Sequence, residues 1–180
     1  MRTTDAVLIT GPAASGKSTL GARLVRLLDD RELFSEDAYW VRHGWGAGLR
    51  SVEQEAVVQA AVLEDVLAAH GAGRGAVIEF ILYKPPPNPL SAYREALDAA
   101  GLGHRTIALA PSVEVILDRM RRRGRPDDLT DLDGRRLGAR RQLDCVRAPT
   151  TAADLIVEDD ATIDEIADRW LSRPPSDGSR

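Results

Sequence analysis

The chain has 180 residues, 43% apolar and 29% charged, a composition typical of a folded globular domain that excludes disordered and fibrous proteins. Its formal net charge of −4 argues against a nucleic-acid partner, because binding a phosphate backbone usually needs a basic face. The single cysteine, Cys145, excludes an intramolecular disulfide, and the N-terminal apolar run Val7-Leu8-Ile9 is too short to span a membrane. We therefore expect a cytoplasmic protein, a monomer or a homodimer, without a membrane partner, that acts on a small molecule.

Strands and helices are expected to alternate along the chain. Short apolar runs predict strands at 7–10, 33–35, 76–82, 105–110 and 155–157. Apolar residues at helical spacing predict helices at 18–28, 52–69, 90–100, 113–123, 135–147 and around 163–170. This order favours an α/β fold with three layers, a doubly wound and mostly parallel five-stranded sheet whose ligands bind at the carboxyl ends of the strands. We expect a single domain over residues 1–172 and a flexible tail at 173–180.

A phosphate-binding loop is predicted between the first strand and its helix. The sequence GPAASGKS at 11–18 satisfies the pattern G-x-x-x-x-G-K-[ST], in which backbone N–H groups surround a phosphate. Lys17 is expected to reach the β- and γ-phosphates, and the Ser18 hydroxyl to coordinate Mg²⁺. We predict ATP and Mg²⁺ as cofactors, with GTP as the alternative nucleotide. The residues expected to contact the nucleotide in this loop are Gly11, Ala13, Ala14, Ser15, Gly16, Lys17, Ser18 and Thr19.

Other nucleotide-binding classes fit less well. The chain has no N-K-x-D motif for guanine recognition, and its D-x-x-G match at 131–134 does not follow an apolar strand. A GTPase is therefore disfavoured.

Carboxylates follow the second predicted strand, in the segment Ser35-Glu36-Asp37-Ala38-Tyr39-Trp40. Here the sequence resembles the P-loop small-molecule kinases, the group that contains shikimate kinase, gluconate kinase and chloramphenicol phosphotransferase. The resemblance implies that Asp37 contacts the acceptor hydroxyl and acts as, or near, the general base. A solvated aspartate that caps a helix is the alternative interpretation.

The acceptor-binding region is expected at about 37–50 and 79–90. Glu79 interrupts an apolar strand, where an unpaired charge is costly, so we expect it to contact an acceptor hydroxyl or a water on Mg²⁺, or to form a structural ion pair. Trp40 and Trp45 belong to a glycine-rich segment suited to closing over a ring or a sugar. A surface loop with one buried tryptophan is the competing interpretation.

Arginines gather in a predicted lid at about 119–136, where positive charge can neutralise a transferring phosphoryl group. Arg119 and Arg123 share a helix face, so both can point into the cleft. With Asp127-Asp128 and the arginines of 135–141, they resemble the lid of adenylate-kinase-related enzymes, whose arginines contact adenine and the phosphates. A solvated basic face is the alternative for about half of these arginines. The resemblance also implies that the backbone of 158–161 contacts adenine.

Together these features predict a kinase that transfers the γ-phosphoryl group of ATP to a hydroxyl of a small molecule such as an antibiotic, a sugar or a nucleoside-like compound. The predicted catalytic residues are Lys17, Asp37, Arg119 and Arg123, with Arg119 also on the nucleotide. A nucleoside or nucleotide kinase of the same fold remains an alternative, as does a regulatory module that binds ATP without catalysis.

Overall fold

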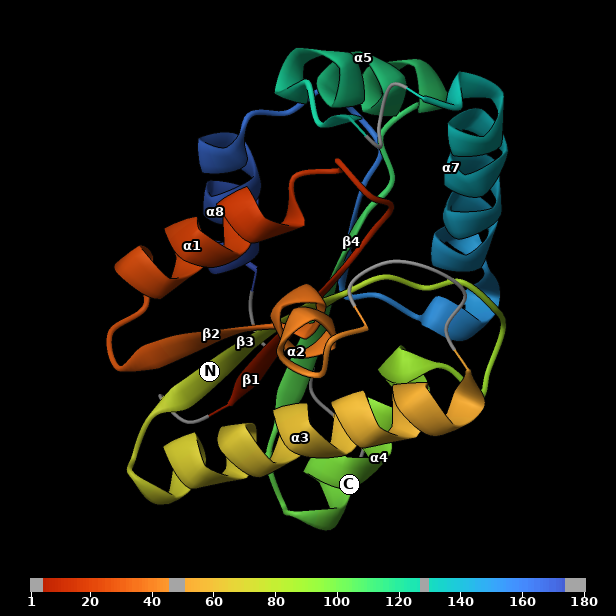
Figure 1. Ribbon diagram of the computed structural model, residues 1–180. Helices are drawn as coiled ribbons and strands as arrows, with labels where there is room; N and C mark the ends of the chain where they lie inside the picture. The colour runs from red at the N-terminus through yellow and green to blue at the C-terminus, as the bar shows by residue number, and fades with distance from the viewer. Residues whose placement is uncertain (1–4, 46–50, 127–129, 174–180) are drawn as a thin grey trace.

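The computed structural model describes residues 5–45, 51–126 and 130–173, which build a five-stranded sheet between two layers of helices (Figure 1). The strand order is β2-β3-β1-β4-β5, and every neighbouring pair is parallel. This confirms the predicted doubly wound sheet. The strands are β1 (Ala6–Thr10), β2 (Arg31–Ser35), β3 (Gly75–Phe80), β4 (His104–Leu109) and β5 (Leu155–Val157).

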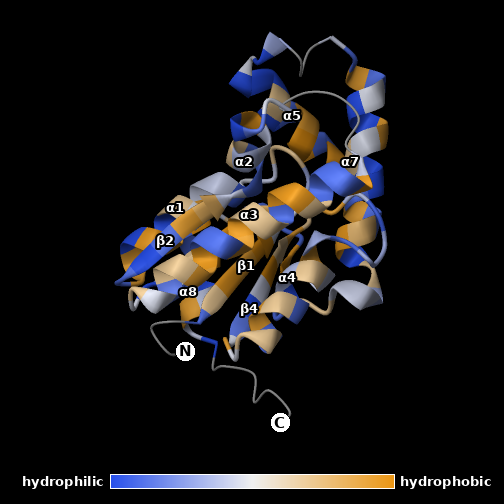
Figure 2. Cartoon of the chain, turned by 60° about the horizontal axis from the view of Figure 1, so that its bottom comes forward, coloured by the Kyte–Doolittle hydropathy of each residue, from blue (hydrophilic) through white to orange (hydrophobic). Residues whose placement is uncertain are grey.

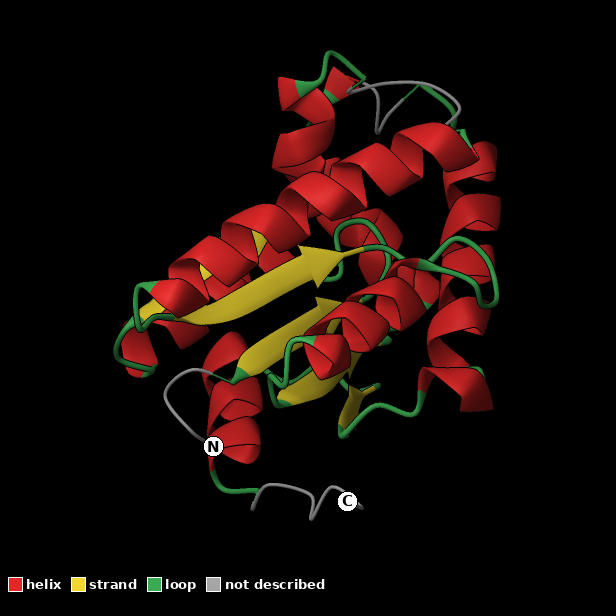
Figure 3. Cartoon of the chain, turned by 90° about the horizontal axis from the view of Figure 1, so that it is seen from below, coloured by secondary structure: helices red, strands yellow, loops and turns green. Residues whose placement is uncertain are grey.

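Helices cover both faces of the sheet (Figure 3). Side chains alternate along β1, so Val7 and Ile9 pack with α1 and α8, whereas Leu8 packs with the helices on the opposite face. The described helices are α1 (Lys17–Leu27), α2 (Glu36–Arg42), α3 (Val52–Gly71), α4 (Pro89–Ala99), α5 (Val113–Arg123), α7 (Leu132–Arg147) and α8 (Ile163–Leu171), with a 3₁₀ turn at Pro149–Thr151.

The apolar strands lie inside the molecule and the hydrophilic helix faces lie outside (Figure 2). The two apolar clusters on the faces of the sheet are buried and include the largest side chains, such as Trp40 on one face and Trp170 on the other. The Arg105 guanidinium lies 4.0 Å from the centroid of the Trp170 ring. None of the helices in the described ranges combines the length and apolar character that a membrane span requires.

Two elements differ from the sequence prediction. Residues 36–42 form α2, where a strand end and a pliable segment were expected; Ser35 precedes this helix, and the acidic residues Glu36 and Asp37 occupy its first turn, where negative charge favours a helix. Helix α7 begins at Leu132, and the Asp131 side chain accepts a hydrogen bond of 2.8 Å from the amide of Gly134. The D-x-x-G match is thus a helix cap.

Some predicted segments fall partly outside the described residues. These are 46–50 of the glycine-rich acceptor region, Asp127 and Asp128 of the lid, and 174–180 of the tail. The expected lid range of 119–136 takes in the end of α5 and the start of α7, which begins at Leu132.

Candidate active site

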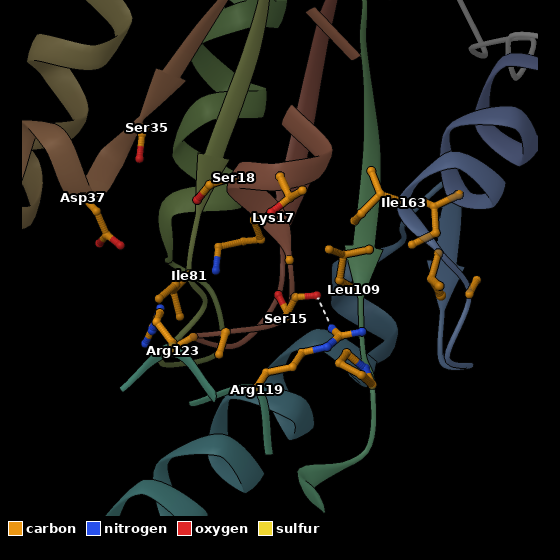
Figure 4. Close-up of a pocket in the computed structure, with 18 of the residues that line it drawn as sticks. Ser15, Lys17, Ser18, Ser35, Asp37, Ile81, Leu109, Arg119, Arg123 and Ile163 are labelled. Atoms are coloured by element: carbon orange, nitrogen blue, oxygen red, sulfur yellow. Dashed lines mark hydrogen bonds between the residues drawn. The ribbon is translucent and has the colours of Figure 1, made fainter. Parts of the chain in front are cut away.

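A cavity of about 1000 Å³ opens at the carboxyl ends of the central strands. The loop that follows β1 forms one wall, the start of α2 another, and arginines of α5 a third (Figure 4). Arg135 of α7 also lines the cavity. The cavity therefore brings together the predicted phosphate loop, the predicted acceptor region and the predicted lid, which are far apart in the sequence.

Two glycines shape the loop between β1 and α1. A Cβ atom on Gly11 would lie 2.6 Å from the carbonyl oxygen of Leu109 and 2.7 Å from Ser15 Oγ, so only glycine fits there. Gly16 has a φ of 106°, a left-handed conformation that L-residues rarely adopt, and it precedes the first turn of α1. Ala13 to Thr19 all line the cavity, where the N-terminus of α1 favours an anion.

The Lys17 side chain is buried at the floor of the cavity. Its Nζ donates hydrogen bonds of 3.1 Å and 3.0 Å to the carbonyl oxygens of Gly11 and Pro12. Burial lowers the pKa of Lys17 to about 8, although the carboxylates of Glu79, Asp37 and Glu36 act in the opposite direction. A bound triphosphate would add further negative charge beside this buried ammonium.

Ser18 and Glu79 form the part of the site that could hold a metal ion. Ser18 Oγ donates a hydrogen bond of 2.9 Å to Glu79 Oε1, while Glu79 Oε2 is buried and has no hydrogen-bond partner in the part of the chain that is described. Glu79 is not among the residues that line the cavity, so its contact with an acceptor hydroxyl or with a water on Mg²⁺ stays a prediction. No cluster of three histidine, cysteine or acidic residues suited to a metal occurs within the described ranges.

The acceptor side of the cavity is built by the first two turns of α2. Asp37 and Val41, one turn apart, line it together with Ser35, Trp40 and Ile81. Figure 4 shows the Asp37 carboxylate and the Lys17 amine facing the same space. The carboxylate predicted as the general base and the lysine predicted to bind phosphates therefore face one cavity.

The two predicted acceptor tryptophans differ in position. Trp40 is only 1% exposed and belongs to the core, although part of it reaches the cavity wall. Trp45 does not line the cavity: its ring stacks on His43 with centroids 5.1 Å apart, and lies 6.1 Å from the Trp40 ring. The aromatic side chains thus pack on one another, an arrangement closer to the alternative of a buried tryptophan.

Four lid arginines line the cavity: Arg119, Arg123, Arg125 and Arg135. Arg119 Nη1 donates a hydrogen bond of 2.8 Å to the carbonyl oxygen of Ser15, shown as a dashed line in Figure 4. Other lid arginines pair on the surface, as Arg122 does with Asp118 at 2.5 Å. The expectation that Arg119 and Arg123 face the cleft together agrees with their positions.

The end of the cavity beyond the phosphate loop has both apolar and acidic lining residues. Three residues of the segment expected near adenine line it, Asp159, Asp160 and Ala161. Glu158 does not line it; its carboxylate pairs with Arg147 at 3.0 Å. The apolar lining of this end consists of Leu109, Pro111, Val157, Ile163 and Ile166.

Comparison with known families identifies the domain. A family model described as AAA domain matches residues 7–145, most of the chain, from β1 into α7. The chain belongs to the AAA domain family. No curated protein matches the sequence significantly.

Solved structures with the same fold as this AAA domain include P-loop small-molecule kinases, which confirms the resemblance inferred from the sequence. A gluconokinase from Sinorhizobium meliloti 1021 is 18% identical over 95% of this chain and 91% of its own, with a TM-score of 0.66. Shikimate kinase from Acinetobacter baumannii, solved with shikimate, is 21% identical over 94% and 92%, with a TM-score of 0.60. Mycobacterium tuberculosis APS kinase, solved with AMPPNP and APS, is 17% identical over 95% and 97%, with a TM-score of 0.66.

Sequence reasoning missed two polar residues of the AAA domain that support its cavity. Glu36 is buried beside Asp37 and accepts a hydrogen bond of 3.1 Å from the Tyr93 hydroxyl. Gln142 of α7 accepts a hydrogen bond of 3.1 Å from the amide of Ala13 in the phosphate loop. The acidic pair after β2 was a signal for Glu36, whereas nothing in the local sequence around Gln142 indicates its partner.

The low pKa of Lys17 predicts how nucleotide affinity depends on pH. Above about pH 8 the free protein loses the Lys17 proton. A bound triphosphate would raise the pKa of Lys17 again, so the Lys17 amine must take up a proton from solution when the nucleotide binds. The affinity for ATP should therefore be insensitive to Lys17 below about pH 8 and should fall above it, by up to about tenfold per pH unit. Titration calorimetry at constant excess Mg²⁺ would measure this. Proton uptake would be obtained by comparing the binding enthalpy in two buffers. An ATP affinity that is equal at pH 7.5 and pH 9.5, with no proton uptake on binding, would contradict this prediction.

Proposed function

We propose that this AAA domain is an ATP- and Mg²⁺-dependent kinase that phosphorylates a hydroxyl of a small molecule. The observation that supports this most is that Lys17 and Asp37 line one cavity, one on the phosphate loop and the other on the acceptor side. A carboxylate that faces the phosphate loop across one cavity suits a kinase, because it can orient an acceptor hydroxyl.

The proposed reaction is in-line phosphoryl transfer. The acceptor oxygen attacks the γ-phosphorus as the bond to the β–γ bridging oxygen breaks, which gives ADP and a phosphate ester. Asp37 orients the hydroxyl and takes its proton late in transfer. Lys17, Arg119 and Arg123 neutralise charge on the phosphate oxygens, and the apolar end of the cavity holds the base.

Ser18 and Glu79 are the residues that we propose for magnesium. The ion, when bound, would neutralise charge on the β- and γ-phosphates. Because Glu79 accepts the hydrogen bond of the Ser18 hydroxyl, the lone pairs of that oxygen would be available to the ion. The buried Glu79 Oε2, which has no partner among the described residues, would accept a hydrogen bond from a water on the ion.

Glu79→Gln should weaken the use of magnesium. We expect the Mg²⁺ concentration for half-maximal ATP binding to rise by about 10- to 100-fold. Losing a residue that is hydrogen-bonded to a metal ligand typically lowers the metal affinity by that factor. Calorimetry of ATP at a series of Mg²⁺ concentrations would measure it. Glu32→Gln, on the surface of β2 and paired with Arg74, is the matched control and should leave the Mg²⁺ dependence unchanged. Identical curves for Glu79→Gln and the wild type would contradict this role.

The kind of acceptor is open among an antibiotic, a sugar and a nucleoside-like compound. The fold neighbours include a gluconokinase, a shikimate kinase solved with shikimate and an APS kinase solved with APS. We infer that an acceptor of comparable size lies between Asp37 and Ile81. Residues 1–172 as one domain, the cytoplasmic location and the monomeric or dimeric state remain predictions.

Product analysis tests the proposal directly. The protein would be incubated with ATP and Mg²⁺ and separate panels of sugars, hydroxylated antibiotics, nucleosides and nucleotides, and new phosphate esters sought by mass spectrometry. A phosphorylated sugar or antibiotic would support the proposed small-molecule kinase. A phosphorylated nucleoside or nucleotide would instead favour a nucleoside or nucleotide kinase of the same fold. Tight ATP binding without any product would favour a regulatory module.

A further inference from the structure

The phosphate loop contains a strained residue at its tip. Ala14 has a φ of 60°, a left-handed conformation that is unfavourable for a residue with a Cβ atom. An unliganded loop with such a residue would relax toward negative φ unless neighbouring atoms held it. What holds Ala14 is therefore relevant to nucleotide binding.

Two side chains, one from α7 and one from α5, hold the residues on either side of Ala14. The amide of Ala13 donates to Gln142 Oε1 of α7 at 3.1 Å, and the carbonyl oxygen of Ser15 accepts from Arg119 Nη1 of α5 at 2.8 Å. Gln142 binds an N–H group of the loop backbone, and Arg119 binds a carbonyl oxygen of the loop backbone. The strained residue is thus bracketed by hydrogen bonds from two different helices.

The position of Gln142 on α7 makes this contact specific. Gln142 lies three residues after Ala139 and four residues before Val146, so it shares the packed face of the helix with these two buried residues. A polar side chain on that face needs a partner, and the Ala13 amide supplies it. Because this amide donates to Gln142, its hydrogen is directed toward α7.

We propose that Gln142 is a positioning residue that, together with Arg119, pre-organises the phosphate loop for a nucleoside triphosphate. This inference rests on the proposed nucleotide-binding function. The energy that orders the loop is then supplied before the nucleotide arrives, so less binding energy is lost in ordering it. The Gln142 hydrogen bond also couples α7 to the geometry of the phosphate loop. Helix α7 carries Arg135, which lines the cavity.

The test is a double-mutant cycle between Gln142 and Ala14. Gln142→Leu keeps the side-chain size but removes the acceptor, and should weaken ATP binding by about tenfold in calorimetry with Mg²⁺. Glycine tolerates a positive φ, so in an Ala14→Gly background the same change should cost less than about threefold. Leu137→Gln, half-exposed on α7 and away from the cavity, should leave ATP affinity unchanged.

Hydrogen exchange of the Ala13 amide in the nucleotide-free protein gives an independent readout. It should be faster in Gln142→Leu than in the wild type, with global thermal unfolding little changed. Equal ATP affinity of Gln142→Leu and the wild type would overturn the inference. It would also be overturned if Gln142→Leu weakened ATP binding by the same factor in the wild-type protein and in the Ala14→Gly variant. A wild-type protein that binds no ATP would contradict the proposed function itself, and the exchange rate would still show whether Gln142 holds the loop.

Discussion

Lys17→Ala should lower the rate of phosphoryl transfer by about a thousandfold or more, because one positioned cation at a transferring phosphoryl group typically contributes that much. The Lys17 ammonium is buried at the floor of the cavity, close enough to Glu79 and Asp37 for their charges to affect its pKa. We expect ATP affinity to fall as well, since the ground-state triphosphate loses its cation. Initial rates of ADP formation with an accepted hydroxyl compound, combined with calorimetry, would measure both effects.

The matched control is Lys84→Ala. Lys84 is the other lysine of the chain and pairs with Glu55 at 2.6 Å outside the cavity, so its removal should leave ATP affinity unchanged. Thermal unfolding of both variants would separate loss of binding from loss of folding. Full turnover by Lys17→Ala would contradict the placement of phosphates at this loop.

Asp37→Asn should lower kcat by about 100-fold or more while changing ATP affinity little, since a positioned general base contributes roughly 10² to 10⁴. The asparagine amide keeps the shape of the side chain but cannot take the proton from the hydroxyl of the acceptor molecule. Steady-state rates with varied acceptor and ATP would separate kcat from the two KM values.

Glu53→Gln provides the comparison for Asp37, because it neutralises a carboxylate in the first turn of another helix, α3, away from the cavity. It should retain the wild-type kcat. If Asp37→Asn also retained full kcat, Asp37 would not be the base, and the interpretation as a helix-terminal aspartate would be preferred.

The sheet and the phosphate loop were predictable because their signals are local. Apolar runs mark the strands, and the spacing of Gly11, Gly16 and Lys17 marks the loop. Glu79 stood out as a charge in an apolar strand, but its partner Ser18 is 61 residues away and depends on the pairing of Ile9 with Glu79 in the sheet.

Local signals failed where the structure depends on distant packing. Helix α2 has only seven residues and is rich in aromatic side chains that pack against α3 and β3, so its helical pattern was weak. Trp45 was expected at the acceptor but stacks on His43. The Gln142 contact joins residues 129 positions apart, and no sequence pattern on either side indicates it.

Titration of the protein with ATP and Mg²⁺ in a calorimeter tests the central claim most directly. The proposed phosphate site predicts saturable binding of about one nucleotide per chain, weakened by Lys17→Ala and by removal of Mg²⁺. Absence of any nucleoside triphosphate binding at millimolar ligand, by a protein that is folded, would contradict it.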